Sequence, residues 1–324
     1  MSSYAVGIDL GGTNLKAALV HKNEGLVETA RRPTQAKKGP DHVVAQIGTL
    51  ARELADEAPT TPVVGVGIGA PGAINWDRTT VIKPPNFPDW DTVDLSARLQ
   101  THFGEGQSVI VENDANVAGL GSAFYGAGRD YDSFIMVTLG TGVGGAIIYQ
   151  NQIFRGSTGG AAEIGHMTID YEGPFANSGV AGAIEGYLGQ SFLSSHAADR
   201  LLNAPDSRVY DLVDGDLDAL TPRLLYEAAE AGDEAARDIL AWAGDKLGCV
   251  VGSAINLLDI RTVIVGGGVS AAGDYILDPA RETMPRYVTP GLRDHLSIVQ
   301  EVLGNEVSLL GAARLVFEGR EAHV

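Results

Sequence analysis

The sequence predicts an α/β protein of two domains around a cleft, and three observations lead to this prediction. The chain has 324 residues, which favours two domains over one. Apolar runs typical of buried strands alternate with helical patterns. A strand, a glycine and threonine turn and a second strand follow one another twice, as LGGT at 10–13 and LGTG at 139–142. The repetition indicates a duplicated plan with one such turn in each half.

The composition excludes several classes of protein. Hydrophobic residues make up 44% of the chain, which is enough for packed cores. Lys and Arg number 23 against 41 Asp and Glu, so the formal net charge is −18. This acidity argues against a nucleic-acid partner and against docking to an anionic membrane. No apolar run reaches about 18 residues, so we expect no membrane span.

Cysteine usage and the N-terminus predict a cytoplasmic location. Cys249 is the single cysteine, which excludes an intrachain disulfide and suits a reducing compartment. The N-terminal residues enter a strand directly and lack the layout of a signal peptide.

The first glycine turn is a candidate phosphate loop. Strand-like residues Tyr4–Ile8 precede it, and Leu15–Val20 follow as the returning strand of a hairpin. Glycines let the backbone approach a phosphate, and Thr13 adds a hydroxyl donor. Asp9 can hold a magnesium ion directly or through water. An ordinary hairpin turn is the alternative at this point, and no Walker A loop is present.

Helical and strand patterns alternate after this hairpin. Asp41 is a predicted N-cap, because apolar residues recur at helical spacing after it. Residues 62–68 form a predicted buried strand, which ends in a loop that contains Gly72. The loop Pro84–Trp90 carries two aromatic residues and one amide; it could line a sugar pocket or serve only the structure.

The centre of the chain holds a candidate catalytic carboxylate. Val109–Val111 reads as a strand that runs into a helix of small residues, with Asn113 and Asp114 at the junction. Polar side chains at such a junction can hold a small polar substrate. Asp114 would lie at a helix N-terminus, where partial positive charge favours a carboxylate.

The second glycine turn repeats the first. Strand Phe134–Leu139 leads into Gly140–Gly145, and strand Ala146–Tyr149 follows. Two phosphate loops are a stronger signal than one. Further along, Glu163 and His166 stand among small residues that leave room for a ligand, although a solvated Glu and a core His would look the same.

The C-terminal third supplies helices and a third glycine turn. Thr221 and Pro222 form a helix start, and Glu234–Leu258 is a predicted long helix. Strand Arg261–Val265 leads into three glycines that would let a planar base or ribose lie on backbone. Helices are expected from Asp274 and over Val307–Phe317.

Taken together, five motifs resemble those of the ROK family of sugar kinases and repressors, within the actin and hexokinase superfamily. They occur in the family's order: DLGGTNLK at 9–16, ENDANVA at 112–118, LGTGVGG at 139–145, EIGH at 163–166 and TVIVGGG at 262–268. The resemblance implies two actin-like (ribonuclease H-like) domains around a central cleft. We expect the first domain to hold residues 1–115 and about 305–324, and a larger second domain to hold 116–304.

The resemblance also implies a role for each matching residue. Asp114 would accept or orient the proton of a hexose 6-hydroxyl. The other ring hydroxyls would be bound by Gly72, Asn113, Glu163, His166 and Glu185. ATP, with Mg²⁺ near Asp9, would be held by Asp9, Gly11, Gly12, Thr13, Asn14, Lys16, Gly140, Thr141 and Gly142, and its adenosine by Gly266, Gly267 and Gly268.

One departure from the family concerns zinc. Many members carry the motif C-x-C-G-x-x-G-C-x-E after ExGH, and here its three cysteine positions are Ala176, Ser178 and Ala183. A structural zinc needs about four ligands, which His166 alone cannot supply. We therefore predict no zinc and expect Pro174 and Phe175 to hold this loop by packing.

Three functions fit these observations to different degrees. The first is an ATP-dependent kinase of glucose; N-acetylhexosamines, mannose and fructose are alternative substrates. The second is a sugar-responsive repressor, but the first phosphate motif begins at Asp9, which leaves no room before it for a helix-turn-helix domain. The third is a non-catalytic sugar-binding protein, against which Asp114 and the phosphate loops argue. The family also suggests a homodimer or homotetramer.

Overall fold

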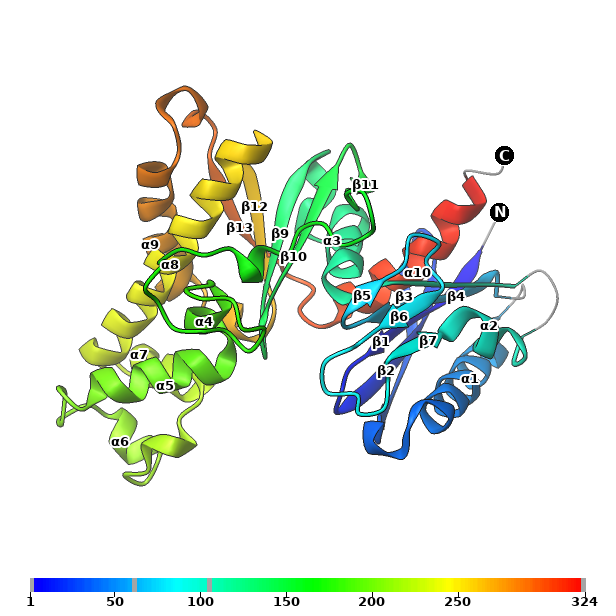
Figure 1. The fold of residues 1–324 in the computed structure, drawn as a ribbon, viewed down its shortest axis with the longest axis horizontal. Helices are drawn as coiled ribbons and strands as arrows, with labels where there is room; N and C mark the ends of the chain where they lie inside the picture. Colours follow the sequence, from blue (N-terminus) through cyan, green and yellow to red (C-terminus); the bar gives the residue numbers. More distant parts are fainter. Residues whose placement is uncertain (1–2, 60–62, 104–106, 322–324) are drawn as a thin grey trace. The chain divides into compact units, whose positions relative to one another are not determined.

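The computed structural model describes residues 3–59, 63–103 and 107–321, and it shows an α/β chain (Figure 1). The chain divides into two compact units. Unit 1 comprises Met1–Asp132, Ala146–Ala162 and Asn305–Val324, and unit 2 comprises Ser133–Gly145 and Glu163–Gly304. The domain limits expected from the sequence stay a prediction.

The sheet of unit 1 brings three chain segments to one edge. Its strand order is β3-β2-β1-β4-β8. Strands β1, β2 and β3 pair antiparallel, whereas β1, β4 and β8 run parallel. The bounds are β1 Tyr4–Leu10, β2 Asn14–His21, β3 Gly25–Pro33, β4 Gly65–Ala70 and β8 Ser108–Asn113. Because parallel strands end at the same edge, the first glycine turn, the loop of Gly72 and the start of the next helix all follow that edge.

Glycines let a helix lie against the backbone of this sheet. A Cβ added at Gly7 or Gly67 would lie 1.9 or 1.7 Å from a carbonyl oxygen of α10. The helices of unit 1 are α1 Pro40–Asp56, α2 Leu95–Gln100, α3 Asp114–Tyr125 and α10 Glu306–Glu321. A small antiparallel sheet holds β5 Ala73–Ile74, β6 Thr80–Ile82 and β7 Thr92–Asp94.

The second five-stranded sheet has the order β11-β10-β9-β12-β13. Strands β9, β12 and β13 are parallel, and Gly266 at the end of β12 pairs with Thr138 of β9. The bounds are β9 Phe134–Leu139, β10 Val143–Tyr149, β11 Gln152–Ile153, β12 Thr262–Gly266 and β13 Ser297–Gln300. The helices of unit 2 are α4 Glu185–Leu188, α5 Gln190–Leu201, α6 Val209–Leu212, α7 Pro222–Glu230, α8 Glu234–Leu258 and α9 Asp274–Thr283.

Most predicted elements are confirmed, and one helix start is wrong. The α/β class is confirmed by two mixed five-stranded sheets. Helix α1 begins at Pro40 with Gly39 as N-cap, whereas the sequence predicted Asp41 as the cap. Proline suits the first helical position because its missing N–H needs no partner there. The predicted strand from residue 62 starts at Gly65 among the described residues, and residues 60–62 lie outside them.

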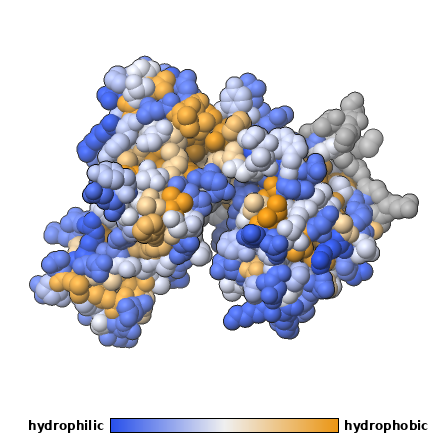
Figure 2. Space-filling model, viewed as in Figure 1, coloured by the Kyte–Doolittle hydropathy of each residue, from blue (hydrophilic) through white to orange (hydrophobic). Residues whose placement is uncertain are grey.

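The surface and the helices agree with the composition. Hydrophilic residues cover much of the face in Figure 2, and apolar residues gather there in separate patches. No helix within the described residues has the length and apolar character needed to cross a membrane.

Candidate active site

The junction of β8 and α3 holds two of the predicted site residues and contacts a third. Asn113 caps α3: its Oδ1 accepts hydrogen bonds from the backbone N of Ala115 at 2.9 Å and of Asn116 at 3.3 Å. Its Nδ2 donates to the carbonyl oxygen of Gly72 at 3.3 Å. Gly72 has φ +89°, and a Cβ there would lie 2.8 Å from Cα of Pro84, so the loop requires glycine. The structure thus brings Gly72 and Asn113 together.

Asp114 is the first residue of α3, as the sequence predicted. It is exposed, and its Oδ1 accepts a hydrogen bond from the N of Ala115 at 2.8 Å. The helix continues for 12 residues, so its N-terminal backbone favours a negative charge at this position. An exposed carboxylate on a fixed helix end can accept a proton from a bound hydroxyl.

The first glycine turn, a predicted phosphate loop, is held by backbone and hydroxyl contacts. Gly11 N donates to Asn14 O at 3.1 Å, and the buried Thr34 donates through Oγ1 to Gly11 O at 2.6 Å. Thr34 N also donates to Thr13 O at 3.0 Å. Asp9 Oδ2 lies 3.0 Å from Lys16 Nζ across the β1–β2 pair. The turn therefore presents its backbone, a carboxylate and an ammonium group together.

The loop Pro84–Trp90 reaches this turn through its amide residue. A Cβ at Gly12 would lie 3.0 Å from Cβ of Asn86. Phe87 and Trp90 are each 4% exposed, and their ring centroids are 4.9 Å apart. Both aromatic residues belong to the core of unit 1, which favours the structural alternative for them.

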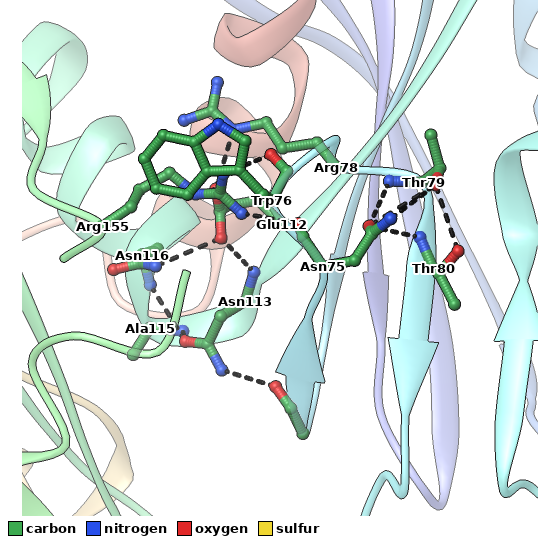
Figure 3. A network of polar contacts seen from close by, with 11 residues as sticks. Asn75, Trp76, Arg78, Thr79, Thr80, Glu112, Asn113, Ala115, Asn116 and Arg155 are labelled. Carbon is green, nitrogen blue, oxygen red and sulfur yellow. Dashed lines mark hydrogen bonds and ion pairs between the residues drawn. The ribbon is translucent and has the colours of Figure 1, made fainter. Parts of the chain in front are cut away.

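A buried carboxylate lies directly before the junction (Figure 3). Glu112 is 0% exposed. Its Oε2 lies 2.9 Å from Arg78 Nε and 2.8 Å from Arg155 Nε. The Arg155 contact is an ion pair, since the Nε–H does not point along this line. Burial lowers the pKa of Arg155, and the Glu112 carboxylate counteracts that effect.

In unit 2, Glu185 contacts the second glycine turn, which is also a predicted phosphate loop. Glu185 Oε2 accepts a hydrogen bond from Val143 N at 3.2 Å, and a Cβ at Gly142 would lie 2.3 Å from this oxygen. Gly140 O accepts from Gln190 N at 3.0 Å. The sequence assigned Glu185 to sugar hydroxyls, and the structure places it against the turn Gly140–Gly142.

The third glycine turn lies beside the second. Gly267 has φ +88°, and a Cβ there would lie 2.4 Å from Leu139 O, at the end of β9. A cavity of about 460 Å³ in unit 2 is lined by residues that include Thr141, Asp218, Leu220 and the serines of α5. The residues that line this cavity do not include Gly266, Gly267 or Gly268.

Glu163 and His166 occupy a short turn against β10. Their segment packs closely, because a Cβ at Gly165 would lie 1.9 Å from Val143 O. Glu163 Oε2 lies 3.7 Å from His166 Nε2, and Ser178 Oγ lies 3.1 Å from His166 Nδ1. The side chain of Glu163 is 62% exposed and that of His166 is 36% exposed. Both side chains can reach a ligand.

Comparisons with known proteins identify the family of this chain. The model of the ROK family matches residues 5–318. The chain belongs to the ROK family.

Relatives of this ROK chain include kinases and repressors. It is 33% identical to glucokinase of Thermotoga maritima over 97% of each chain. It resembles the crystal structure of a ROK glucokinase from Streptomyces griseus in complex with glucose and AMPPNP, with a TM-score of 0.85, 33% identity and coverage of 98% and 100%. It is also 26% identical to a xylose repressor of Caldicellulosiruptor bescii, over 96% of this chain and 77% of that protein.

Backbone hydrogen bonds hold the segment 174–184, where the sequence predicts no zinc. The expectation that Pro174 and Phe175 hold it by packing is wrong, since both are exposed and Phe175 is 68% exposed. Backbone hydrogen bonds hold it instead: Ala176 N to Val180 O, Gly182 N to Pro174 O and Ile184 N to Met167 O. Within residues 3–59, 63–103 and 107–321, no group of three or more His, Cys, Asp or Glu could hold a metal ion.

The sequence predicts neither Arg78 nor Arg155 as a site residue. Neither arginine lies in a recognised motif, and Glu112 has no assigned role within ENDANVA. Only the buried position of Glu112 shows that it needs cationic partners, and burial of one residue in a strand cannot be read from the residue itself.

Proposed function

We propose that this protein transfers the γ-phosphoryl group of ATP to the 6-hydroxyl of a hexose, with glucose as the substrate. Asp114 carries the proposal: a carboxylate fixed at the start of α3, beside an Asn113–Gly72 pair that offers amide and carbonyl groups. The likeness to glucokinases over nearly the whole chain supports glucose.

In this proposal the protein works mainly by positioning. Phosphoryl transfer needs an aligned nucleophile and stabilised charge, with little covalent chemistry from the protein. Asp114 accepts a hydrogen bond from the 6-hydroxyl and takes its proton late, because the helix end stabilises the carboxylate. The second N–H of the Asn113 amide, the Gly72 loop, Glu163, His166 and Glu185 bind the other hydroxyls.

The turns 9–16 and 140–142 hold the phosphates, and 266–268 the adenosine. Asp9 fits a magnesium ion that accompanies ATP, because Mg²⁺ keeps several waters and takes only one or two carboxylates. Lys16, 3.0 Å from Asp9, would balance phosphate charge at the same turn. When bound, the ion would neutralise charge on the phosphates. Asp9 would hold the ion, and Lys16 would contact the phosphates beside it.

A coupled kinase assay tests this function. Purified protein with ATP and magnesium would be offered glucose, mannose, fructose, N-acetylglucosamine, N-acetylmannosamine and allose. We expect the highest kcat/KM with glucose. Preference for an N-acetylated sugar would keep the chemistry and change the substrate. No turnover with any sugar, with ATP or polyphosphate as donor, would refute the kinase function and favour a regulator.

A further inference from the structure

The buried carboxylate of Glu112 is joined to four groups from different parts of unit 1. Oε2 contacts Arg78 and Arg155, while Oε1 accepts from Asn113 N at 2.9 Å and from Asn116 Nδ2 at 3.2 Å. A carboxylate has about four acceptor positions; three hydrogen bonds reach Glu112, and Arg155 adds an ion pair beside Oε2. A buried charge is stable only when its partners are well placed.

Arg78 and Arg155 connect the turn 75–80 to the Glu112 carboxylate. Arg155 donates through Nη1 to Trp76 O at 2.6 Å and through Nη2 to Asn75 O at 2.9 Å. Its guanidinium lies 5.1 Å from the centroid of the Trp76 ring. Arg78 O accepts a hydrogen bond from Val111 N at 2.8 Å, next to Glu112 in β8. Figure 3 shows these side chains converging on Glu112.

This turn connects to the sugar side of the proposed site. Asn75 directly follows β5, and β5 directly follows Gly72. Asn75 Oδ1 accepts from Thr79 N and Thr80 N at 2.9 Å each, which closes the turn. Arg155 and Arg78 thus hold one end of the segment whose other end, Gly72, meets the Asn113 amide. Glu112 holds the backbone N of that same Asn113.

We propose that Glu112, Arg78 and Arg155 form a positioning unit that sets the Asn113 amide and the Gly72 carbonyl for the sugar. None of the three needs to touch the substrate. They act by holding β8, the turn 75–80 and the start of α3 in one arrangement, so that Asn113 and Asp114 are preorganised. The role of this unit in sugar binding rests on the function proposed above. Its role in ordering residues 108–118 does not depend on that function.

The variant E112Q tests the unit, because glutamine keeps the size of the side chain and removes its charge. We expect the glucose KM to rise about tenfold, the size of one hydrogen bond, while the ATP KM stays within about twofold of wild type. A structural defect without a positioning role would move both constants. Hydrogen exchange of the peptide 108–118 should become faster in E112Q.

E53Q is the matched control, since Glu53 also pairs with an arginine in unit 1 but is 52% exposed. It should change neither constant nor the exchange of 108–118. If E112Q does not fold, R78K replaces it, because Arg78 is 30% exposed and lysine keeps the charge while losing the directed Nε contact.

The wild-type assay keeps the two proposals apart. If wild type prefers another hexose, that hexose replaces glucose as the probe. If wild type turns over no sugar, the kinase function fails, and hydrogen exchange alone decides the inference. Unchanged exchange of 108–118 in folded E112Q or R78K, or a sugar KM within about twofold of wild type, would overturn the positioning unit.

Discussion

Two segments with predicted sugar-binding residues are held in opposite ways. Asn113 and Asp114 follow a fully buried carboxylate that two arginines and an asparagine amide surround. Glu163 and His166 lie on a turn whose backbone packs against β10, but their side chains are partly exposed and one serine hydroxyl contacts His166. A directed, buried charge network fixes side chains more tightly than exposed contacts do, because water competes with the latter. We therefore expect the first segment to be preorganised and the second to adapt to the ligand.

The largest effect should come from the most firmly fixed segment. D114N should lower kcat about a thousandfold, because a positioned general base contributes about 10²–10⁴ to the rate. Glucose affinity, measured by calorimetry, should change little, since asparagine keeps the shape and the helix position. A variant with near wild-type kcat would show that Asp114 does not handle the proton.

Cysteines placed at the three motif positions should make the segment of Glu163 and His166 more rigid, which tests its contrast with the segment of Asn113 and Asp114. The triple variant A176C/S178C/A183C would offer three thiolates beside His166, which is a complete set for structural zinc. We expect one zinc per chain and a midpoint of unfolding higher by several degrees, reversed by a chelator. Metal analysis of wild type should find no bound zinc, and one tightly held ion per wild-type chain would contradict this view of the loop.

A smaller effect is expected from the serine at the same place. S178A removes the hydroxyl 3.1 Å from His166 Nδ1, so the imidazole loses one orienting contact. The glucose KM should rise about threefold, less than in E112Q, because the contact is exposed. S253A is a suitable control, since Ser253 is an exposed serine whose hydroxyl bonds the backbone within α8. An S178A effect as large as that of E112Q would remove the contrast between the segments.

The smallest effect is expected at the exposed Phe175, in contrast to the buried Ile184 of the same segment. F175A should leave the free energy of unfolding within about 0.5 kcal/mol of wild type, as expected for a surface position. I184A should cost about 2–4 kcal/mol, because Ile184 is 0% exposed. Denaturant titration of both variants measures this. A larger loss of unfolding free energy in F175A than in I184A would show that Phe175, and not Ile184, holds this loop by packing.

The regular elements could be predicted because their signals are local. Strand Phe134–Leu139 and helix Glu234–Leu258 match the structure residue for residue, and Asp114 starts a helix as expected. Each depends on a run of apolar residues or on a cap, which neighbouring residues largely determine. The ROK family could be recognised for the same reason, since each motif is a short contiguous string.

The sequence by itself determined the α/β class, the family and the glycine turns. Only the tertiary structure decided which side chains contact one another around the candidate site. Arg155 lies 43 positions after Glu112, and Arg78 lies 34 before it, so no periodicity connects the three. The exposure of Phe175 and the contact of Ser178 with His166 likewise depend on how the loop folds back. Pairing between distant residues follows from burial, because a charge removed from water must find partners wherever the fold brings them.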